Sequence, residues 1–86
     1  MNTKHQNTLK TVLSTPTPKN VLWSDVEALF IAIGCKAVEG RGSRVRFLHV
    51  EKGIWATFHR PHPAKEAKSY QVKAAKNFLE LLEIQP

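Results

Sequence analysis

The pattern of apolar residues from position 21 onwards predicts a helix at the start of a folded unit. Its apolar positions recur at helical spacing and fall on one face: Leu22, Val26, Leu29, Phe30 and Ile33. Ser24-Asp25-Val26-Glu27 has the form of a capping box, in which the serine hydroxyl accepts from the Glu27 amide and the carboxylate reaches back. Gly34 predicts the end of this helix, because glycine readily adopts the left-handed C-terminal conformation.

A second helix is predicted from Lys65 or Lys68 to Glu83. Its apolar arc covers more than half of the circumference and comprises Tyr70, Val72, Ala74, Ala75, Phe78, Leu79, Leu81 and Leu82. One small sheet does not need so wide a cover. The excess is either a surface for a partner or part of an unusually apolar core helix, and the sequence leaves both interpretations open.

Between these helices the pattern changes to that of β-strands. Residues 36–39 form a short candidate strand, followed by a turn at 40–43. Residues 44–50 and 54–59 alternate between apolar and polar, and the tight connection between them has a glycine at position 53. The inward positions of these two strands are Val45, Phe47, Ile54, Ala56 and Phe58. The pattern predicts an antiparallel meander of three strands.

The predicted order is helix, three strands and helix, which defines an α+β fold with a three-stranded antiparallel sheet and both helices on one face. This α-β-β-β-α order is that of a double-stranded-RNA-binding-like fold, and we assign it to residues 21–86. Residues 1–20 contain three lysines and no acid, and they end in Thr15-Pro16-Thr17-Pro18. We expect a flexible basic leader there, with at most one helical turn from Leu9 to Leu13.

Composition narrows the class of protein. The 86 residues leave room for one small domain, and a hydrophobic fraction of 42% is enough for a globular fold. The longest apolar run, residues 28–33, is too short to cross a bilayer, and the first residues lack the apolar core of a signal peptide, so we expect a cytoplasmic protein without membrane contact. A single cysteine, Cys35, excludes an internal disulfide. The net charge of +6 favours a polyanionic partner over an incidentally basic surface.

The first cluster of candidate site residues is Gly40-Arg41-Gly42-Ser43-Arg44-Val45-Arg46-Phe47. Arginine side chains fit phosphate oxygens in a bidentate manner, and glycines let backbone amides approach an anion closely. We therefore expect RNA-binding residues here, namely Arg41, Ser43, Arg44 and Arg46. The alternative is an ordinary hairpin turn with solvated arginines.

The second cluster is the segment from Thr57 to Glu66, in which two prolines bracket a histidine. RNA can be cleaved without a metal if one group deprotonates the 2′-hydroxyl and another protonates the leaving 5′-oxygen, and histidine suits both tasks. We expect His59 and His62 to be catalytic, with Arg60 and Lys65 as cationic RNA-binding residues. The alternative is that both histidines are merely solvated or half-buried.

Other candidates favour structural roles. Two histidines three positions apart lack a third ligand at a suitable spacing, so we expect no metal site and no small-molecule cofactor. Cys35 follows a helix C-terminus, where the helix dipole disfavours a thiolate, so it is a poor nucleophile. Trp23 and Trp55 could stack on bases, but core or interface positions explain them as well.

The chain resembles the HicA-type toxins of bacterial type II toxin–antitoxin modules, small mRNA interferases on a double-stranded-RNA-binding-like fold. The resemblance covers residues 21–84 and rests on three pieces in order: Ile33-Gly34, Gly42-Ser43-x-x-x-Phe47 and Pro61-His62-Pro63-Ala64-Lys65-Glu66. It implies mRNA as substrate and a HicB-type antitoxin protein as partner. The wide apolar arc and the basic surface are features that an acidic antitoxin could use.

One position departs from this family. The resemblance implies a catalytic histidine after Gly-Ser, and this chain has Arg44 there. Arginine stays protonated and cannot be the general base. One explanation is that His59 or His62 supplies the base while Arg44 binds phosphate. The other is that the chain has lost cleavage, and is either a non-catalytic RNA-binding module or a degenerate toxin that its antitoxin keeps silent. A third hypothesis, from another class, is an adaptor whose basic face binds an acidic protein and never meets RNA.

Overall fold

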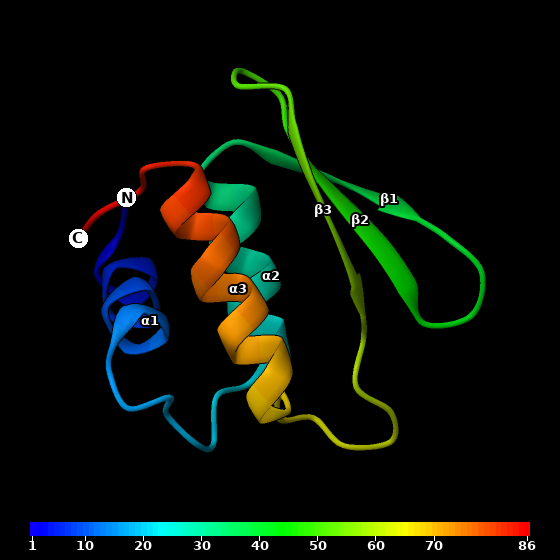
Figure 1. The fold of residues 1–86 in the computed structure, drawn as a ribbon, viewed down its shortest axis with the longest axis horizontal. Coiled ribbons are helices and arrows are strands. Elements are labelled where there is room, and N and C mark those ends of the chain that lie inside the picture. Colours follow the sequence, from blue (N-terminus) through cyan, green and yellow to red (C-terminus); the bar gives the residue numbers. More distant parts are fainter.

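Helices α2 (Trp23–Ala32) and α3 (Ser69–Leu81) cover one face of an antiparallel sheet, and helix α1 (Thr3–Leu13) packs on their far side (Figure 1). The computed structural model describes residues 1–86. The sheet has the order β1-β2-β3, with β1 at Cys35–Glu39, β2 at Arg44–His49 and β3 at Ile54–His59. The predicted α+β class and α-β-β-β-α order are confirmed, with one additional helix before them.

Four phenylalanines hold the helices onto the sheet. Phe30 of α2 lies edge-on to Phe47 of β2 and to Phe78 of α3, with ring centroids 5.0 Å and 5.2 Å apart. Phe58 of β3 joins the same cluster. Aromatic rings attract each other at these separations and tilts. The inward strand positions that the alternation predicts are confirmed as core or core-contacting residues: Val45, Phe47, Ile54, Ala56 and Phe58.

Helix α2 begins differently from the capping-box prediction. Its N-cap is Leu22, and no side chain caps the helix. Glu27 instead accepts hydrogen bonds from the Trp23 indole nitrogen and from Arg60. The capping-box interpretation is therefore wrong, because a guanidinium and an indole together offer the carboxylate stronger donors than one backbone amide. The predicted end is confirmed, since Gly34 follows the helix with φ +107°.

Residues 3–13 differ from the flexible leader that the sequence analysis expects. They form α1, which begins at Asn2, whose side chain accepts from the His5 amide at 2.9 Å. Leu9 and Val12 are buried, with 0% and 1% exposure. So short and polar a helix is marginal by itself, but the surface of α2 and α3 stabilises it. The expectation of a leader is therefore wrong for this helix.

The wide apolar arc of α3 is explained mainly by this extra layer. Helix α3 has the sheet on one side and α1 on the other (Figure 1). Most of the arc is buried in the common core, at Val72, Ala75, Phe78, Leu79 and Leu82. Tyr70 and Leu81 remain exposed, at 61% and 62%.

No helix of the protein has both the length and the apolar content needed to span a bilayer.

His49 connects the end of α2 to the hairpin between β2 and β3. Its buried ring donates from Nε2 to the Ile33 carbonyl at 2.9 Å, and its Nδ1 accepts from the Lys52 amide at 3.2 Å. These two partners select the neutral tautomer with the proton on Nε2. Both nitrogens serve the fold, so His49 is a structural residue.

Candidate functional site

The turn between β1 and β2 presents the first cluster of candidate residues. The Gly40 amide donates to the Arg44 carbonyl at 2.9 Å, and the Arg44 amide donates to the Arg41 carbonyl at 3.0 Å. A Cβ added at Gly40 would lie 3.1 Å from Cβ of Arg44, so glycine leaves the space that the arginine stem occupies. Arg41 and Ser43 are exposed on this turn. The tight turn therefore brings three of the predicted RNA-binding residues to one end of the sheet.

Arg44 of β2 lies directly opposite His59 of β3 in the antiparallel register. Both are exposed, and opposite residues project from the same face of a sheet with Cβ atoms about 4.5–5.5 Å apart. This is the face that the helices leave uncovered (Figure 1). Arg46 projects from the same face two positions further along β2. The sheet thus brings a candidate base next to a cation that suits phosphate.

His62 lies at the same end of the sheet, in the segment that follows β3. It lines an open hollow together with Gly42 and Ser43. The Arg60 amide donates to the Ser43 carbonyl at 2.8 Å and so joins this segment to the turn between β1 and β2. Two regions that are well separated in the sequence therefore meet at this end of the sheet, where His59 ends β3 and His62 follows it.

Arg60 has partners other than the phosphate oxygens that the sequence analysis expects. Its Nε and Nη2 donate to the Glu27 carboxylate at 2.6 Å and 3.1 Å, and its Nη2 donates to Glu39 Oε2 at 2.9 Å. Its Nη1 completes the fork on Glu39. These hydrogen bonds from Arg60 hold the pKa of the Glu39 carboxyl below its usual value. Arg60 therefore ties β3 to α2 and to β1, and it positions the segment that carries His62.

Lys65 lines a different hollow from the one that His62 lines. This second hollow lies near the start of α2, and Trp23, Ser24 and Pro63 also line it. The Trp23 amide donates to the Lys65 carbonyl at 3.0 Å, and the Ala67 amide donates to the Val21 carbonyl at 2.7 Å. The far end of the segment is thereby fixed against α2. Lys65 does not line the hollow that His62 shares with Ser43.

Gln71 is a positioning residue that the sequence analysis missed. It is 2% exposed; its Oε1 accepts from the Lys68 amide at 2.7 Å, and its Nε2 donates to the His59 carbonyl at 2.6 Å. It thereby joins the start of α3 to the end of β3, beside the candidate base. Its place in the third position of a helix, where glutamine often reaches back to the preceding turn, is the signal that could have revealed it.

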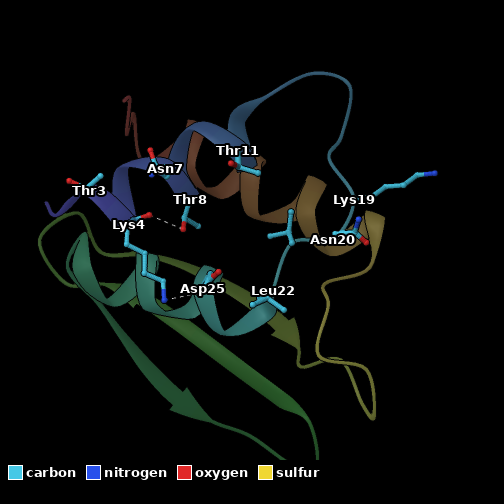
Figure 2. Close-up of a pocket in the computed structure, with 10 residues that line it drawn as sticks. Thr3, Lys4, Asn7, Thr8, Thr11, Lys19, Asn20, Leu22 and Asp25 are labelled. Atoms are coloured by element: carbon cyan, nitrogen blue, oxygen red, sulfur yellow. Dashed lines mark hydrogen bonds and ion pairs between the residues drawn. The ribbon is translucent and has the colours of Figure 1, made fainter.

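The largest hollow of the protein lies elsewhere, between α1, α2 and the segment that joins them (Figure 2). Its volume is about 550 Å³, and threonine, asparagine and lysine side chains line most of it. Lys4 spans it to reach Asp25 at 3.4 Å. No histidine lines this hollow, and one of its two lysines, Lys4, is already paired with a carboxylate. We therefore place the candidate site at the end of the sheet, where histidines and unpaired arginines meet.

Cys35 is not a candidate nucleophile in the folded protein. It is buried at the start of β1, and this burial raises the pKa of its thiol to about 11. A thiol with that pKa is protonated at neutral pH and reacts slowly. No group of three or more histidine, cysteine, aspartate or glutamate side chains converges into a potential metal centre.

Comparison with known protein families adds one finding. The family model described as HicA toxin of bacterial toxin-antitoxin matches residues 23–83, which is more than half of the chain. The match begins at α2, includes the sheet and α3, and leaves α1 outside. All the candidate residues described above, from Arg41 to Gln71, lie within it. No curated protein and no solved structure matches the chain.

Proposed function

Because the chain belongs to the HicA family, the toxins of bacterial toxin–antitoxin systems, we propose that it cleaves mRNA as a metal-independent endoribonuclease and that a HicB-type antitoxin neutralises it. The observation that carries this proposal is the pairing of Arg44 with His59 across β2 and β3. The resemblance implies a histidine at position 44. In this chain an imidazole stands directly opposite that position, on the neighbouring strand and on the same open face.

The chemistry needs only groups that meet at this end of the sheet. His59 takes the proton of a ribose 2′-hydroxyl, whose oxygen then forms a bond to the adjacent phosphorus. The bond from phosphorus to the 5′-oxygen breaks, and His62 donates a proton to that leaving oxygen. Arg44 stabilises the extra negative charge that the phosphorus oxygens carry in the transition state. The products are a 2′,3′-cyclic phosphate and a free 5′-hydroxyl.

The role of the antitoxin follows from the same surface. The family match implies an antitoxin partner. Arg41, Arg44 and Arg46 are exposed and form no ion pair with an acidic side chain of this chain. An acidic HicB-type protein that covers them would compete with RNA for the same cations. Neutralisation by direct occlusion of this end of the sheet is therefore the expected mode.

One observation favours a second candidate function, a toxin relative that binds RNA without cleaving it. Position 44 holds an arginine, and an arginine side chain cannot replace a histidine as general base. If His59 and His62 do not act as acid and base, the cluster of arginines still binds phosphates. The two candidate functions differ in whether either histidine is required.

The first prediction separates them. Induced expression of the native chain in a bacterium is expected to stop growth and to fragment mRNA, while His59→Ala or His62→Ala restores growth. With purified protein, loss of a general acid or base lowers the cleavage rate by about 10²- to 10⁴-fold. Cleavage in the presence of EDTA and 2′,3′-cyclic phosphate ends on the products are the measurements that check metal independence and mechanism.

His5→Ala is the matched control, because His5 lies on α1 outside the family match. It is expected to remain toxic. Arg44→His removes the cation that stabilises the transition state but supplies the histidine that the resemblance implies at this position, and it is expected to retain cleavage because that histidine can act as general base. If the native chain and both histidine variants are equally harmless while the native protein binds RNA tightly, the RNA-binding function replaces the nuclease.

A further inference from the structure

The open face of the sheet carries a continuous set of side chains that the candidate site uses only at one end. Alternation and register assign eight positions to it, in three rows across the strands. The positions are Lys36, Val38, Arg44, Arg46, Leu48, Trp55, Thr57 and His59. No helix covers this face (Figure 1). It is therefore a free surface adjoining the His59 end.

The charge of this face is of one sign. Three of its eight positions are lysine or arginine, one is histidine, and none is acidic. The acidic residues lie on the helices, in loops, or at the sheet edge where Glu39 pairs with Arg60. A sheet face with several cations attracts a polyanion, and without a carboxylate it has no negative charge that would repel one.

Trp55 gives the face a second property. Its side chain is 44% exposed, whereas Trp23 is 5% exposed in the core. The guanidinium of Arg46 lies over the Trp55 ring, 4.1 Å from its centroid. A planar guanidinium stacked on an indole presents a flat cationic surface, on which a nucleobase can stack in turn. Val38 and Leu48 extend the apolar floor beside it.

From these observations we propose that single-stranded RNA lies along the open face of the sheet, with a base stacked on the Trp55–Arg46 pair and phosphates on Lys36 and Arg44. Trp55 and His59 are four residues apart on β3, and a strand rises about 3.3 Å per residue, so about 13 Å separates the stacking position from the candidate base. A strand held in this way leads directly to His59. This proposal deepens the proposed function and rests on it only in taking RNA as the ligand.

The same surface disfavours a duplex. In an A-form helix the bases are stacked inside and their planes are not accessible, so duplex RNA is recognised through its backbone and shape. A flat face whose central feature is a stacked indole and guanidinium fits an unpaired base instead. The platform therefore selects unpaired stretches of an RNA for delivery to the histidines.

Tryptophan fluorescence tests the platform directly, because Trp55 is the exposed one of the two tryptophans. The probe is a short 2′-O-methyl oligonucleotide, which has no free 2′-hydroxyl and so binds without being cleaved. Binding is expected to quench the Trp55 emission of the full chain. Duplex RNA of the same length is expected to bind more weakly.

Variants are compared by the anisotropy of a labelled oligonucleotide. Trp55→Ala is expected to raise Kd about 5- to 100-fold, and Trp55→Phe is expected to retain most of the affinity, because a phenyl ring still stacks. Arg46→Gln is expected to raise Kd about 3- to 10-fold. Tyr70→Ala, which removes an exposed aromatic from α3 instead of from the sheet, serves as the matched control and leaves Kd unchanged.

Several results would overturn the platform. They are an unchanged Kd in Trp55→Ala, an equal loss in Tyr70→Ala, or tighter binding of the duplex. If a second copy of the chain covers this face instead of RNA, sedimentation of the protein without RNA will show a dimer, and Trp55→Ala will dissociate it. Loss of antitoxin binding in Trp55→Ala with unaltered RNA affinity would assign the face to a protein. Absence of cleavage with Trp55-dependent binding would refute the nuclease and leave the platform standing.

Discussion

Arginines of the same type have different roles in this protein, and their neighbours decide which. Arg60 is held by two carboxylates, Glu27 and Glu39, and its guanidinium serves to join three elements. Arg44 and Arg46 are exposed on the open face and form no ion pair within the chain. Arg60, which is next to His59 in the sequence, is thus a positioning residue, whereas Arg44 and Arg46 remain available to RNA.

The second prediction concerns stability at this residue scale. Arg60→Gln leaves the half-buried Glu27 carboxylate without its cation and is expected to lower the free energy of unfolding by about 1–2 kcal/mol. Arg41→Gln, at an exposed position without an ion pair, is the matched control and is expected to change it by less than about 0.5 kcal/mol. Urea unfolding at neutral pH measures both.

The stabilisation by the Arg60–Glu39 pair is expected to decrease as the pH falls. The pKa of the Glu39 carboxyl is lower in the folded protein than its usual value, because Arg60 donates to the ionised form. Its contribution to stability is therefore present above the unfolded pKa and is lost as the pH falls through the folded pKa. The difference in Tm between native protein and Arg60→Gln is expected to narrow from pH 6 to pH 3. A constant difference would contradict the pairing.

At the scale of elements, α1 shows how a helix can depend on its neighbours. It has only three large apolar residues, Leu9, Val12 and Leu13, and its length of 11 residues is marginal for an isolated helix. Packing against α2 and α3 stabilises it, and it in turn covers part of the apolar arc of α3. The family match leaves this helix outside, so the chain adds a third layer to the part that the family model describes.

The third prediction tests whether α1 belongs to the cooperative core. Leu9→Ala removes a side chain with 0% exposure and is expected to lower the free energy of unfolding by about 2–4 kcal/mol. Lys10→Ala changes the exposed neighbour and is expected to have an effect within about 0.5 kcal/mol. Equal effects of the two substitutions in urea unfolding would mean that α1 is detached in solution.

At the scale of the whole molecule, the net charge of +6 is distributed unevenly. The open face of the sheet has no acidic position, while the acidic side chains lie on the helices, in loops and at the edge tied to Arg60. Such a polarity orients a polyanion before contact, because the attraction acts over about 8–10 Å at physiological salt. For the proposed binding of RNA, this polarity makes the sheet, and not the helical layers, the expected contact surface.

The fourth prediction follows from this polarity. Two phosphate contacts, at Lys36 and Arg44, are expected to give a slope of about −1.4 in a plot of log K against log salt concentration for single-stranded RNA. Lys36→Gln is expected to make the slope shallower by about 0.7. Lys10→Gln, on α1, removes the same charge from the opposite side and is expected to leave the slope unchanged. Absence of RNA binding even at low salt would favour the adaptor hypothesis.

Local patterns in the sequence determined the order of the elements from α2 to α3 and the inward strand residues. The period of two in residues 54–59 predicts the observed strand, and Gly34 marks the end of α2, because strand alternation and turn conformation depend on residues close in sequence. The same is true of the meander, whose short connections allow only antiparallel neighbours. Local patterns also indicated the histidines and the arginines at the start of β2 as candidate site residues.

Only the tertiary structure decided which of these residues meet. Arg60 finds its carboxylates 33 and 21 positions away, and Gln71 reaches His59 from the start of another helix. Glu27 likewise does not cap α2 as predicted, because it accepts stronger hydrogen bonds, one of them from Arg60 in a distant segment. The register that places His59 opposite Arg44, and the packing of α1 that leaves the sheet face open, also depend on contacts between segments that no local pattern specifies.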